Sequence, residues 1–204
     1  MTIALIDYGA GNLHSVHNAL RAAGAQDVVI TADAEIVRSA DRIVLPGVGA
    51  FRACIEPLRA IPGMVEAMHE AVFSGGRPFL GICVGMQLLA EAGEEFGRHE
   101  GLGWLPGTVR LIERADPAIK IPHMGWNDVV VARAHPLIEP GEAYFLHSYH
   151  FDAADPADVL ATTDHGGPLV AAVGRDTVLG VQFHPEKSQA YGLATLARFL
   201  EWKP

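Results

Sequence analysis

The sequence predicts an α/β fold in which a mostly parallel central sheet carries helices on both faces and gains antiparallel strands in its C-terminal half. In the first half of the chain, continuous apolar runs alternate with segments of helical spacing, which is typical of βαβ units. After residue 104, short apolar runs follow one another between Gly, Pro and Asp turns, which is typical of antiparallel strands. A length of 204 residues, 50% of them hydrophobic, suits a single domain over 1–204.

Strands of the first half are predicted where β-branched and aliphatic residues cluster, at 2–7, 27–31, 42–47 and 78–83. A helix is predicted after the first strand because apolar residues recur at helical spacing before a glycine stop: Leu13, Val16, Leu20, Ala23 and Gly24. The same spacing predicts a helix before the fourth strand, ending at the Ser-Gly-Gly of 74–76: Met64, Val65, Met68 and Val72.

The second half is predicted to hold six strands and a closing helix. The strands are expected at 107–113, 127–132, 142–151, 158–164, 169–174 and 177–186. The helix is expected over 190–202, where one stripe is apolar: Leu193, Leu196, Ala197 and Leu200. Ligands of open α/β sheets bind beyond the carboxyl ends of the strands, so the residues that carry chemistry are expected at that edge.

Composition argues against several classes of function. A net charge of −9 disfavours a nucleic-acid partner, which requires clustered basic residues. The first residues lack a signal-peptide pattern, and no uncharged apolar stretch approaches the ~18 residues that span a bilayer, so no membrane partner is expected. Two cysteines cannot form a disulfide framework. We therefore expect a soluble protein of the cytoplasm.

Cys83 stands in the stretch Gly81-Ile82-Cys83-Val84-Gly85, between an apolar run and a helical pattern. This form is typical of a strand-to-helix elbow, in which small flanking residues let the turn close around a projecting nucleophile. The N–H of the next residue then faces a developing oxyanion, and the helix dipole stabilises a thiolate. Glycines also serve packing at such turns, and free cysteine is commonly buried. By itself, this stretch leaves an ordinary buried thiol open.

His184 and Glu186 offer a base for such a nucleophile, because they lie two residues apart after an apolar run. In an extended chain, residues i and i+2 point to the same side, so the carboxylate could orient the imidazole as the acidic member of a triad does. A solvated Glu186 beside a core-edge His184 is the alternative. A metal site made by this pair with His147 and His150 is disfavoured, because those two histidines fall on opposite faces of a strand. No metal is expected.

Two glycine-containing loops follow predicted strands. The stretch 45–51 places Gly47, Val48 and Gly49 where backbone N–H groups can face a phosphate or an oxyanion. It lacks the Lys-Ser/Thr ending of a P-loop, and the stretch 7–12 has only two of the three glycines of a dinucleotide fingerprint. No nucleotide or other cofactor is expected.

Taken together, these stretches resemble the class I glutamine amidotransferases. The resemblance rests on GICVGMQLL, on PGVG before it and on FHPEKS after it. DYGAGNLHSV, IPHMGWN and YFLHSYHF narrow it to the glutaminase subunits of imidazole glycerol phosphate synthase, and the resemblance extends over 7–188. The chain departs from the pattern at Val84, where the family usually has leucine; because this position acts through its backbone N–H, we expect only a change in packing.

The resemblance implies that Cys83, His184 and Glu186 hydrolyse glutamine to glutamate and ammonia through a cysteine thioester. It implies an oxyanion hole formed by the N–H of Val84 and by the loop of Gly47, Val48 and Gly49. The implied contacts to glutamine are Gln87, Glu95, Ser148 and Tyr149. Cys54 matches no catalytic motif and is expected to be structural.

The resemblance also implies a partner. A (β/α)8-barrel cyclase subunit (HisF) would form a heterodimer with this chain and use its ammonia for imidazole glycerol phosphate synthesis in histidine biosynthesis. The implied docking residues are Asn12, Pro122, Met124, Trp126, Tyr144 and Lys187. Trp and Tyr are residue types that anchor interfaces, although each of these residues could instead serve ordinary packing.

Two other functions compete with this one: a free-standing thiol hydrolase such as a γ-glutamyl peptidase, and a non-catalytic binding subunit of the same fold. The stretches 7–12 and 121–127 have no evident role in the first, and the intact triad argues against the second. Gly47 and Gly49 also permit a peptide flip. We therefore hypothesise an oxyanion hole that is completed only when the ligand of the partner binds.

Overall fold

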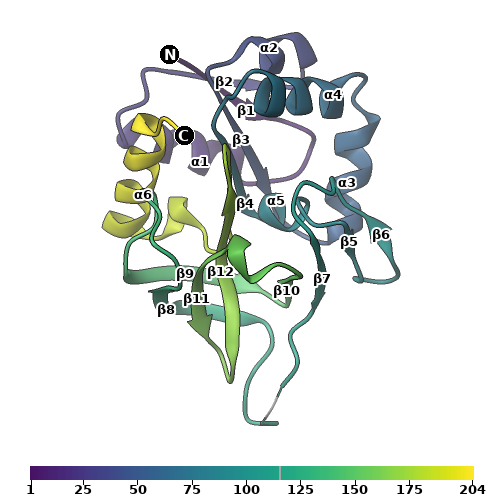
Figure 1. Cartoon of the computed structure of the whole chain (residues 1–204), viewed down its shortest axis with the longest axis vertical. Helices are drawn as coiled ribbons and strands as arrows, with labels where there is room; N and C mark the ends of the chain where they lie inside the picture. Colours follow the sequence, from purple (N-terminus) through teal and green to yellow (C-terminus); the bar gives the residue numbers. More distant parts are fainter. Residues whose placement is uncertain (115) are drawn as a thin grey trace.

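A nine-stranded sheet runs through the protein and carries helices on both faces (Figure 1). The computed structural model describes residues 1–114 and 116–204. The strands lie in the order β2-β1-β3-β4-β13-β12-β11-β8-β9. Their bounds are β1 Thr2–Ile6, β2 Asp27–Thr31, β3 Arg42–Gly47, β4 Phe79–Cys83, β8 His123–Val131, β9 Gly141–His147, β11 Val159–Asp164, β12 Pro168–Arg175 and β13 Val178–Val181. The predicted α/β class is confirmed.

The parallel part of the sheet consists of β2, β1, β3, β4 and β13. β3, β4 and β13 are buried throughout, which is why they read as continuous apolar runs. In the register, Gly47 at the end of β3 pairs with Cys83 at the end of β4, and Val181 of β13 pairs with Ile82. Three neighbouring strands therefore end at one edge, where a ligand site is expected.

The other four strand pairs of this sheet are antiparallel, as predicted for the C-terminal half, so the sheet is mixed and not purely parallel. β12 turns into β13 through Asp176 and Thr177, and so short a connection joins only antiparallel neighbours. The two halves meet at β13, which is parallel to β4 and antiparallel to β12.

The predicted strand 142–151 forms two strands that belong to different sheets. β9 ends at His147, and β10 (Tyr149–Ala153) begins after Ser148 in a second sheet with the order β10-β7-β5-β6. Its other members are β7 (Gly107–Leu111), β5 (Ala92–Gly93) and β6 (His99–Glu100). Ser148 therefore joins the two sheets, and His147 and His150 fall on separate ones.

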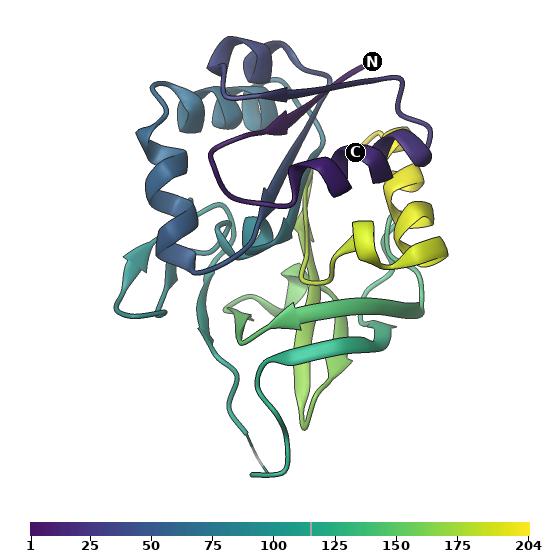
Figure 2. The same cartoon turned by 180° about the vertical axis from the view of Figure 1, so that it is seen from behind.

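Helices α1 (Leu13–Ala22) and α6 (Gln189–Glu201) pack side by side on one face of the main sheet (Figure 2). The other face carries α2 (Ala34–Ser39), α3 (Phe51–Ala60), α5 (Val84–Gln87) and α4 (Met64–His69), which continues as π-helix over Glu70–Ser74. The predicted helices correspond to α1, α4 with its extension, and α6. The sequence did not predict α3, in which Pro57 interrupts the usual helical signal.

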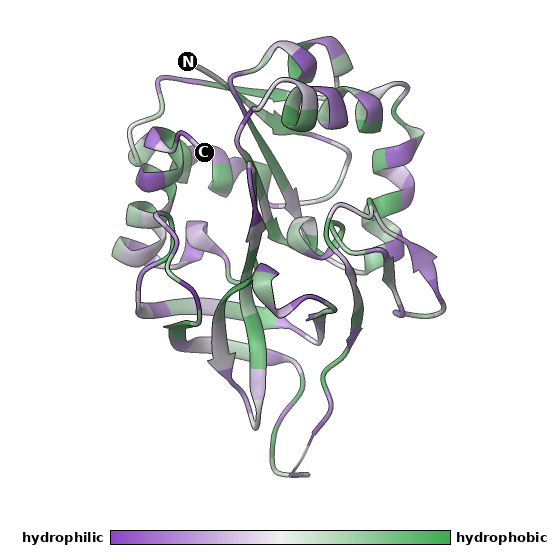
Figure 3. Ribbon diagram, viewed as in Figure 1, coloured by the Kyte–Doolittle hydropathy of each residue, from purple (hydrophilic) through white to green (hydrophobic). Residues whose placement is uncertain are grey.

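Apolar residues concentrate on the central strands and on the helix faces that cover them (Figure 3). Leu45, Phe79 and Phe183 are among the fully buried side chains, and they come from three adjacent strands or their immediate extensions. Within residues 1–114 and 116–204, no helix combines the length and the apolar character needed to cross a bilayer.

Candidate active site

Cys83 lies at the turn from β4 into α5 with a strained backbone, φ 54° and ψ −112°. Glycines permit this turn. A Cβ on Gly85 would lie 1.9 Å from the carbonyl oxygen of Leu45, and a Cβ on Gly81 would lie 2.6 Å from that of Gly85. A strained middle residue between small neighbours is the geometry of a nucleophile elbow. The glycines around Cys83 therefore serve the turn itself.

The side chains of His184 and Glu186 form a buried pair. His184 Nδ1 lies 2.8 Å from Glu186 Oε1, and the two side chains are 3% and 1% exposed. Burial lowers the pKa of His184, but hydrogen bonding to Cys83 and Glu186 and their negative charge more than offset it and raise this pKa to about 10. The surroundings of His184 therefore favour its protonated form whenever Cys83 carries a negative charge.

The route by which Glu186 reaches His184 differs from the extended chain that the sequence suggested. β13 ends at Val181, and Pro185–Lys187 form a 3₁₀ turn whose N-cap is His184. The backbone N–H of His184 donates to the carbonyl of Tyr144 on β9 at 2.9 Å. The pairing of i and i+2 therefore arises from a turn that is fixed against a neighbouring strand.

The glycine loop after β3 is held opposite the elbow by side chains from three other segments. The Tyr8 hydroxyl donates to the Pro46 carbonyl at 2.6 Å, and the Cys54 thiol donates to the Val48 carbonyl at 3.4 Å. Glu95 accepts from the N–H of Phe51, which follows the loop, at 2.8 Å. Cys54 is fully buried, so it acts here as a structural thiol that fixes one peptide of the loop.

A cavity of about 290 Å³ lies over the elbow, near the lower end of the roughly 300 Å³ and upward that small-ligand pockets occupy. Its lining brings together most residues predicted for catalysis and substrate binding: Val48, Gly49, Cys83, Val84, Gln87, Glu95, Ser148, Tyr149 and His184. Pro122 and Lys187, predicted as docking residues, also border it. Gly47 lies beneath the lining, since a Cβ there would be 2.6 Å from the N of Gly85, and Glu186 lies behind His184.

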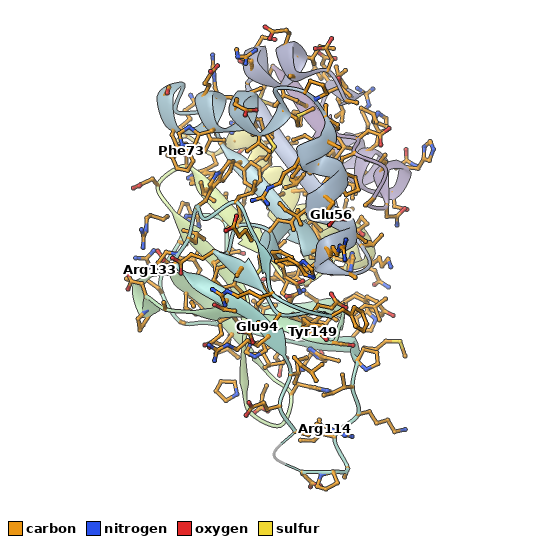
Figure 4. All side chains as sticks on the ribbon, turned by 90° about the vertical axis from the view of Figure 1, so that its right-hand side faces the viewer. Glu56, Phe73, Glu94, Arg114, Arg133 and Tyr149 are labelled. Atoms are coloured by element: carbon orange, nitrogen blue, oxygen red, sulfur yellow. The ribbon has the colours of Figure 1, made fainter. Side chains whose placement is uncertain are left out.

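Two buried amides adjoin Cys83, and sequence reasoning had named only one of them. The Gln87 amide nitrogen donates to the Tyr149 carbonyl and to Gln182 Oε1, both at 3.0 Å. Gln182 in turn donates from Nε2 to Cys83 Sγ at 3.6 Å. A signal for Gln182 was present in the sequence, because it is a polar residue inside the apolar run that ends at His184. Tyr149, which links Gln87 to the second sheet, is labelled in Figure 4.

Several predicted docking residues form an exposed surface beside the cavity. Met124 and Trp126 on β8 are 65% and 47% exposed. Trp126 lies edge-on to Tyr144 of β9 with 6.2 Å between ring centroids, and Lys187 Nζ is 5.9 Å from the centroid of the Tyr144 ring. Asn12, at the N-cap of α1, belongs to a helix that packs on the turn carrying Lys187.

His147, one of the histidines weighed as metal ligands, serves hydrogen bonding in this structure. His123 Nδ1 lies 3.0 Å from His147 Nε2, and His147 Nδ1 lies 2.8 Å from the Tyr149 carbonyl. His150 lies on β10 of the second sheet, where its Nδ1 is buried without a hydrogen-bond partner among the described residues. In the described part of the chain, no group of three or more His, Cys, Asp or Glu side chains is arranged to hold a metal ion.

Comparison with known proteins adds a family context to this geometry. The family model described as glutamine amidotransferase class-I matches residues 4–201. The chain is 60% identical to the imidazole glycerol phosphate synthase subunit HisH of Zymomonas mobilis, with 100% of this chain and 97% of that one covered. It is 58% identical to the subunit of the same name from Rhodospirillum rubrum, with both chains fully covered. A crystal structure of a glutamine amidotransferase has a similar fold, with a TM-score of 0.77, 19% identity and 98% of each chain covered.

Proposed function

The chain belongs to the class-I glutamine amidotransferase family and, within it, to the imidazole glycerol phosphate synthase subunits HisH, and on this premise we propose that Cys83, His184 and Glu186 hydrolyse the side-chain amide of glutamine. The observation that carries the assignment is the buried His184–Glu186 pair at the wall of a cavity whose floor is the Cys83 elbow. As a subunit of this synthase, the chain serves histidine biosynthesis and acts with a partner subunit.

The proposed reaction proceeds in two halves. The Cys83 thiolate attacks the carboxamide carbon, and the tetrahedral intermediate collapses as the His184 imidazolium gives its proton to the leaving nitrogen, releasing ammonia and leaving a glutamyl thioester. Neutral His184 then takes a proton from water, the hydroxide adds to the thioester, and expulsion of the thiolate releases glutamate. Glu186 keeps the imidazole oriented and stabilises its charged form throughout.

The negative oxygen of each tetrahedral intermediate needs donors. We assign these to the N–H of Val84, the first residue of α5, and to an N–H of the loop of Gly47, Val48 and Gly49. Support comes from the register that brings Gly47 opposite Cys83. Whether the loop presents an N–H to the oxyanion without the partner depends on the orientation of the Val48 peptide, whose carbonyl accepts a hydrogen bond from Cys54.

Substrate glutamine is proposed to lie in the cavity with its amide over Cys83. The Glu95 carboxylate suits the positive α-amino group, while Ser148 and Tyr149 suit the α-carboxylate. The nitrogen of Gln87 already donates to two protein oxygens. Gln87 is therefore left with its oxygen for the substrate, so it can only accept a hydrogen bond from a glutamine donor.

Ammonia is proposed to pass to a (β/α)8-barrel cyclase subunit that docks as a heterodimer over the mouth of the cavity. The proposal is supported by exposed Met124 and Trp126, which stand beside Tyr144 and Lys187 at the same rim. The core of a protein interface typically consists of large apolar side chains surrounded by a polar rim. We place the complex in the cytoplasm, where a reducing environment keeps a catalytic thiol available.

The test is Cys83→Ala in the complex with the barrel subunit, measured as glutamate release from glutamine. Activity at the wild-type level in Cys83→Ala would show the triad assignment to be wrong. Cys54→Ser is the matched control, because it removes the other thiol but keeps a hydroxyl donor for the Val48 carbonyl, and it should still trap a glutamyl adduct from labelled glutamine. A free-standing hydrolase would work equally well without the barrel, and a binding subunit would give no adduct.

A further inference from the structure

A chain of buried hydrogen bonds ends on the sulfur of Cys83. Gln182 is fully buried and donates from Nε2 to Cys83 Sγ at 3.6 Å. We propose that Gln182 stabilises the Cys83 thiolate through this bond, and that Gln87 positions its amide for the purpose. The inference rests on the proposed function for its kinetic readout only, since the state of the thiol can be measured without substrate.

The orientation of the Gln182 amide follows from a backbone group. The carbonyl of Tyr149 can only accept, so the Gln87 atom 3.0 Å from it must be the nitrogen. The same nitrogen lies 3.0 Å from Gln182, so the facing atom of Gln182 must be its oxygen. The remaining end of Gln182, which faces Cys83, is therefore the NH₂ group. A flipped amide would place two donors against each other and an oxygen against a thiolate.

The Asp164 carbonyl fixes the donor and acceptor roles at the other end of this series of hydrogen bonds. Asn127 Nδ2 lies 2.7 Å from the Asp164 carbonyl and 3.0 Å from His123 Nε2, so Nε2 accepts. The His123 proton is then on Nδ1 and is donated to His147 Nε2, which leaves His147 to donate from Nδ1 to the Tyr149 carbonyl. The donors of Asn127, His123 and His147 therefore all point the same way, from β8 through β9 towards the Tyr149 carbonyl.

This pattern of donors and acceptors requires His123 and His147 to be neutral, and the surroundings of both rings favour the neutral form. Burial, with the nearby His165 ring, lowers the pKa of His123 to about 4. Burial also lowers the pKa of His147 to about 3, against the hydrogen bond to the Tyr149 carbonyl. A proton added to either ring would place two N–H groups face to face. The Tyr149 carbonyl is thus held by donors from both sides.

The groups around the sulfur fall into two sets with opposite effects. The Gln182 amide and the His184 imidazolium favour the thiolate, because both offer protons to it. The Leu146 carbonyl, 3.9 Å from Sγ, favours the thiol, because it can only accept. Tyr8 and Cys54 also face this region, and their side chains are buried and neutral at neutral pH. Hydrogen bonds to a charged partner are stronger than neutral ones, so removal of one of two donors should measurably shift the balance.

The experiment compares Gln182→Met and Gln182→Glu in the full chain. Met matches the shape of Gln without a donor, and Glu retains an acceptor for Gln87 while placing an oxygen at the sulfur. We expect iodoacetamide to alkylate Cys83 about 10-fold or more slowly in both variants, with a matching loss of thiolate ultraviolet absorbance. In the complex, kcat for glutamine should fall by a similar factor with KM nearly unchanged, because the bond acts on the nucleophile.

The matched control is Thr163→Val, which also replaces a buried polar side chain by an isosteric apolar one but lies on β11, away from Cys83. It should alkylate at the wild-type rate. A second comparison tests the positioning by Gln87: Gln87→Met should slow alkylation in the wild type but add little in the Gln182→Met background. A wild-type alkylation rate in either Gln182 variant, with native circular dichroism, overturns the inference. Absence of glutaminase activity in the wild type would instead refute the proposed function and leave this readout intact.

Discussion

Replacing Gly85 by alanine should disable the elbow while the rest of the fold survives. The added Cβ would lie 2.9 Å from the Leu45 carbonyl carbon and only 1.9 Å from its oxygen, and the second distance is more than 1 Å inside the 3.0 Å below which Cβ contacts do not occur. Leu45 cannot yield, because it is fully buried and paired with Gly81 in the register between β3 and β4. The start of α5, and with it Cys83, must therefore move by about 1 Å.

A displacement of about 1 Å at a reacting group costs on the order of 100-fold in rate, or ~2.7 kcal/mol. Overpacking of a rigid site costs ~1–3 kcal/mol of stability. Gly85→Ala should therefore lower kcat for glutamine about 100-fold and reduce the melting temperature, as measured by glutamate release and thermal unfolding. Gly24→Ala is the control: it has open space and only a left-handed φ of 112°, so it should lose stability but no activity. Wild-type kcat in Gly85→Ala would refute the steric account of the elbow.

The remaining predictions concern charge, docking and acid. Glu186→Gln should lower the pKa of His184 and reduce kcat about 100-fold or more; an unchanged imidazole titration by NMR would contradict this. Trp126→Ala should weaken binding to the barrel subunit by ~1 kcal/mol or more, as checked by calorimetry, while the free chain keeps its fold. Because folding lowers the pKa values of His123 and His147, their contribution to stability is present above about pH 6.5 and is lost as pH falls towards about 4 for His123 and about 3 for His147. The urea midpoint of unfolding should change less between pH 7 and pH 5 in His147→Gln than in the wild type. An equal change in both proteins would contradict this assignment of the pH dependence.

The sequence was informative where chemistry requires a local pattern. The elbow around Cys83 and the pairing of His184 with Glu186 both involve neighbours in the chain, so spacing alone could indicate them. The buried strands of the first half could be expected as well, because parallel strands that are covered on both faces read as continuous apolar runs.

Other features depend on contacts between segments far apart in the chain, and spacing carries no signal for these. Gln182 reaches Cys83 across 99 positions and Gln87 reaches Tyr149 across 62. The change of sheet at Ser148 was hidden for a related reason: the residues on both sides of Ser148 have strand-like composition, so they read as one strand. Glu186 reaches His184 through a 3₁₀ turn, which begins at Pro185 and is fixed by the hydrogen bond from the His184 N–H to the Tyr144 carbonyl.

Tyr144 belongs to two parts of the protein at once. Its ring lies on the proposed docking surface beside Trp126, while its carbonyl accepts the N–H of His184 at 2.9 Å. Its own N–H donates to the Ser188 hydroxyl at 2.9 Å, and that hydroxyl donates to the His184 carbonyl at 2.7 Å. Recognition and catalysis are therefore assigned to different atoms of one residue. Truncating the Tyr144 ring would remove its contact with Trp126 and keep the main-chain hydrogen bonds to His184 and Ser188. A displacement of the β9 main chain on docking would instead move the His184 imidazole.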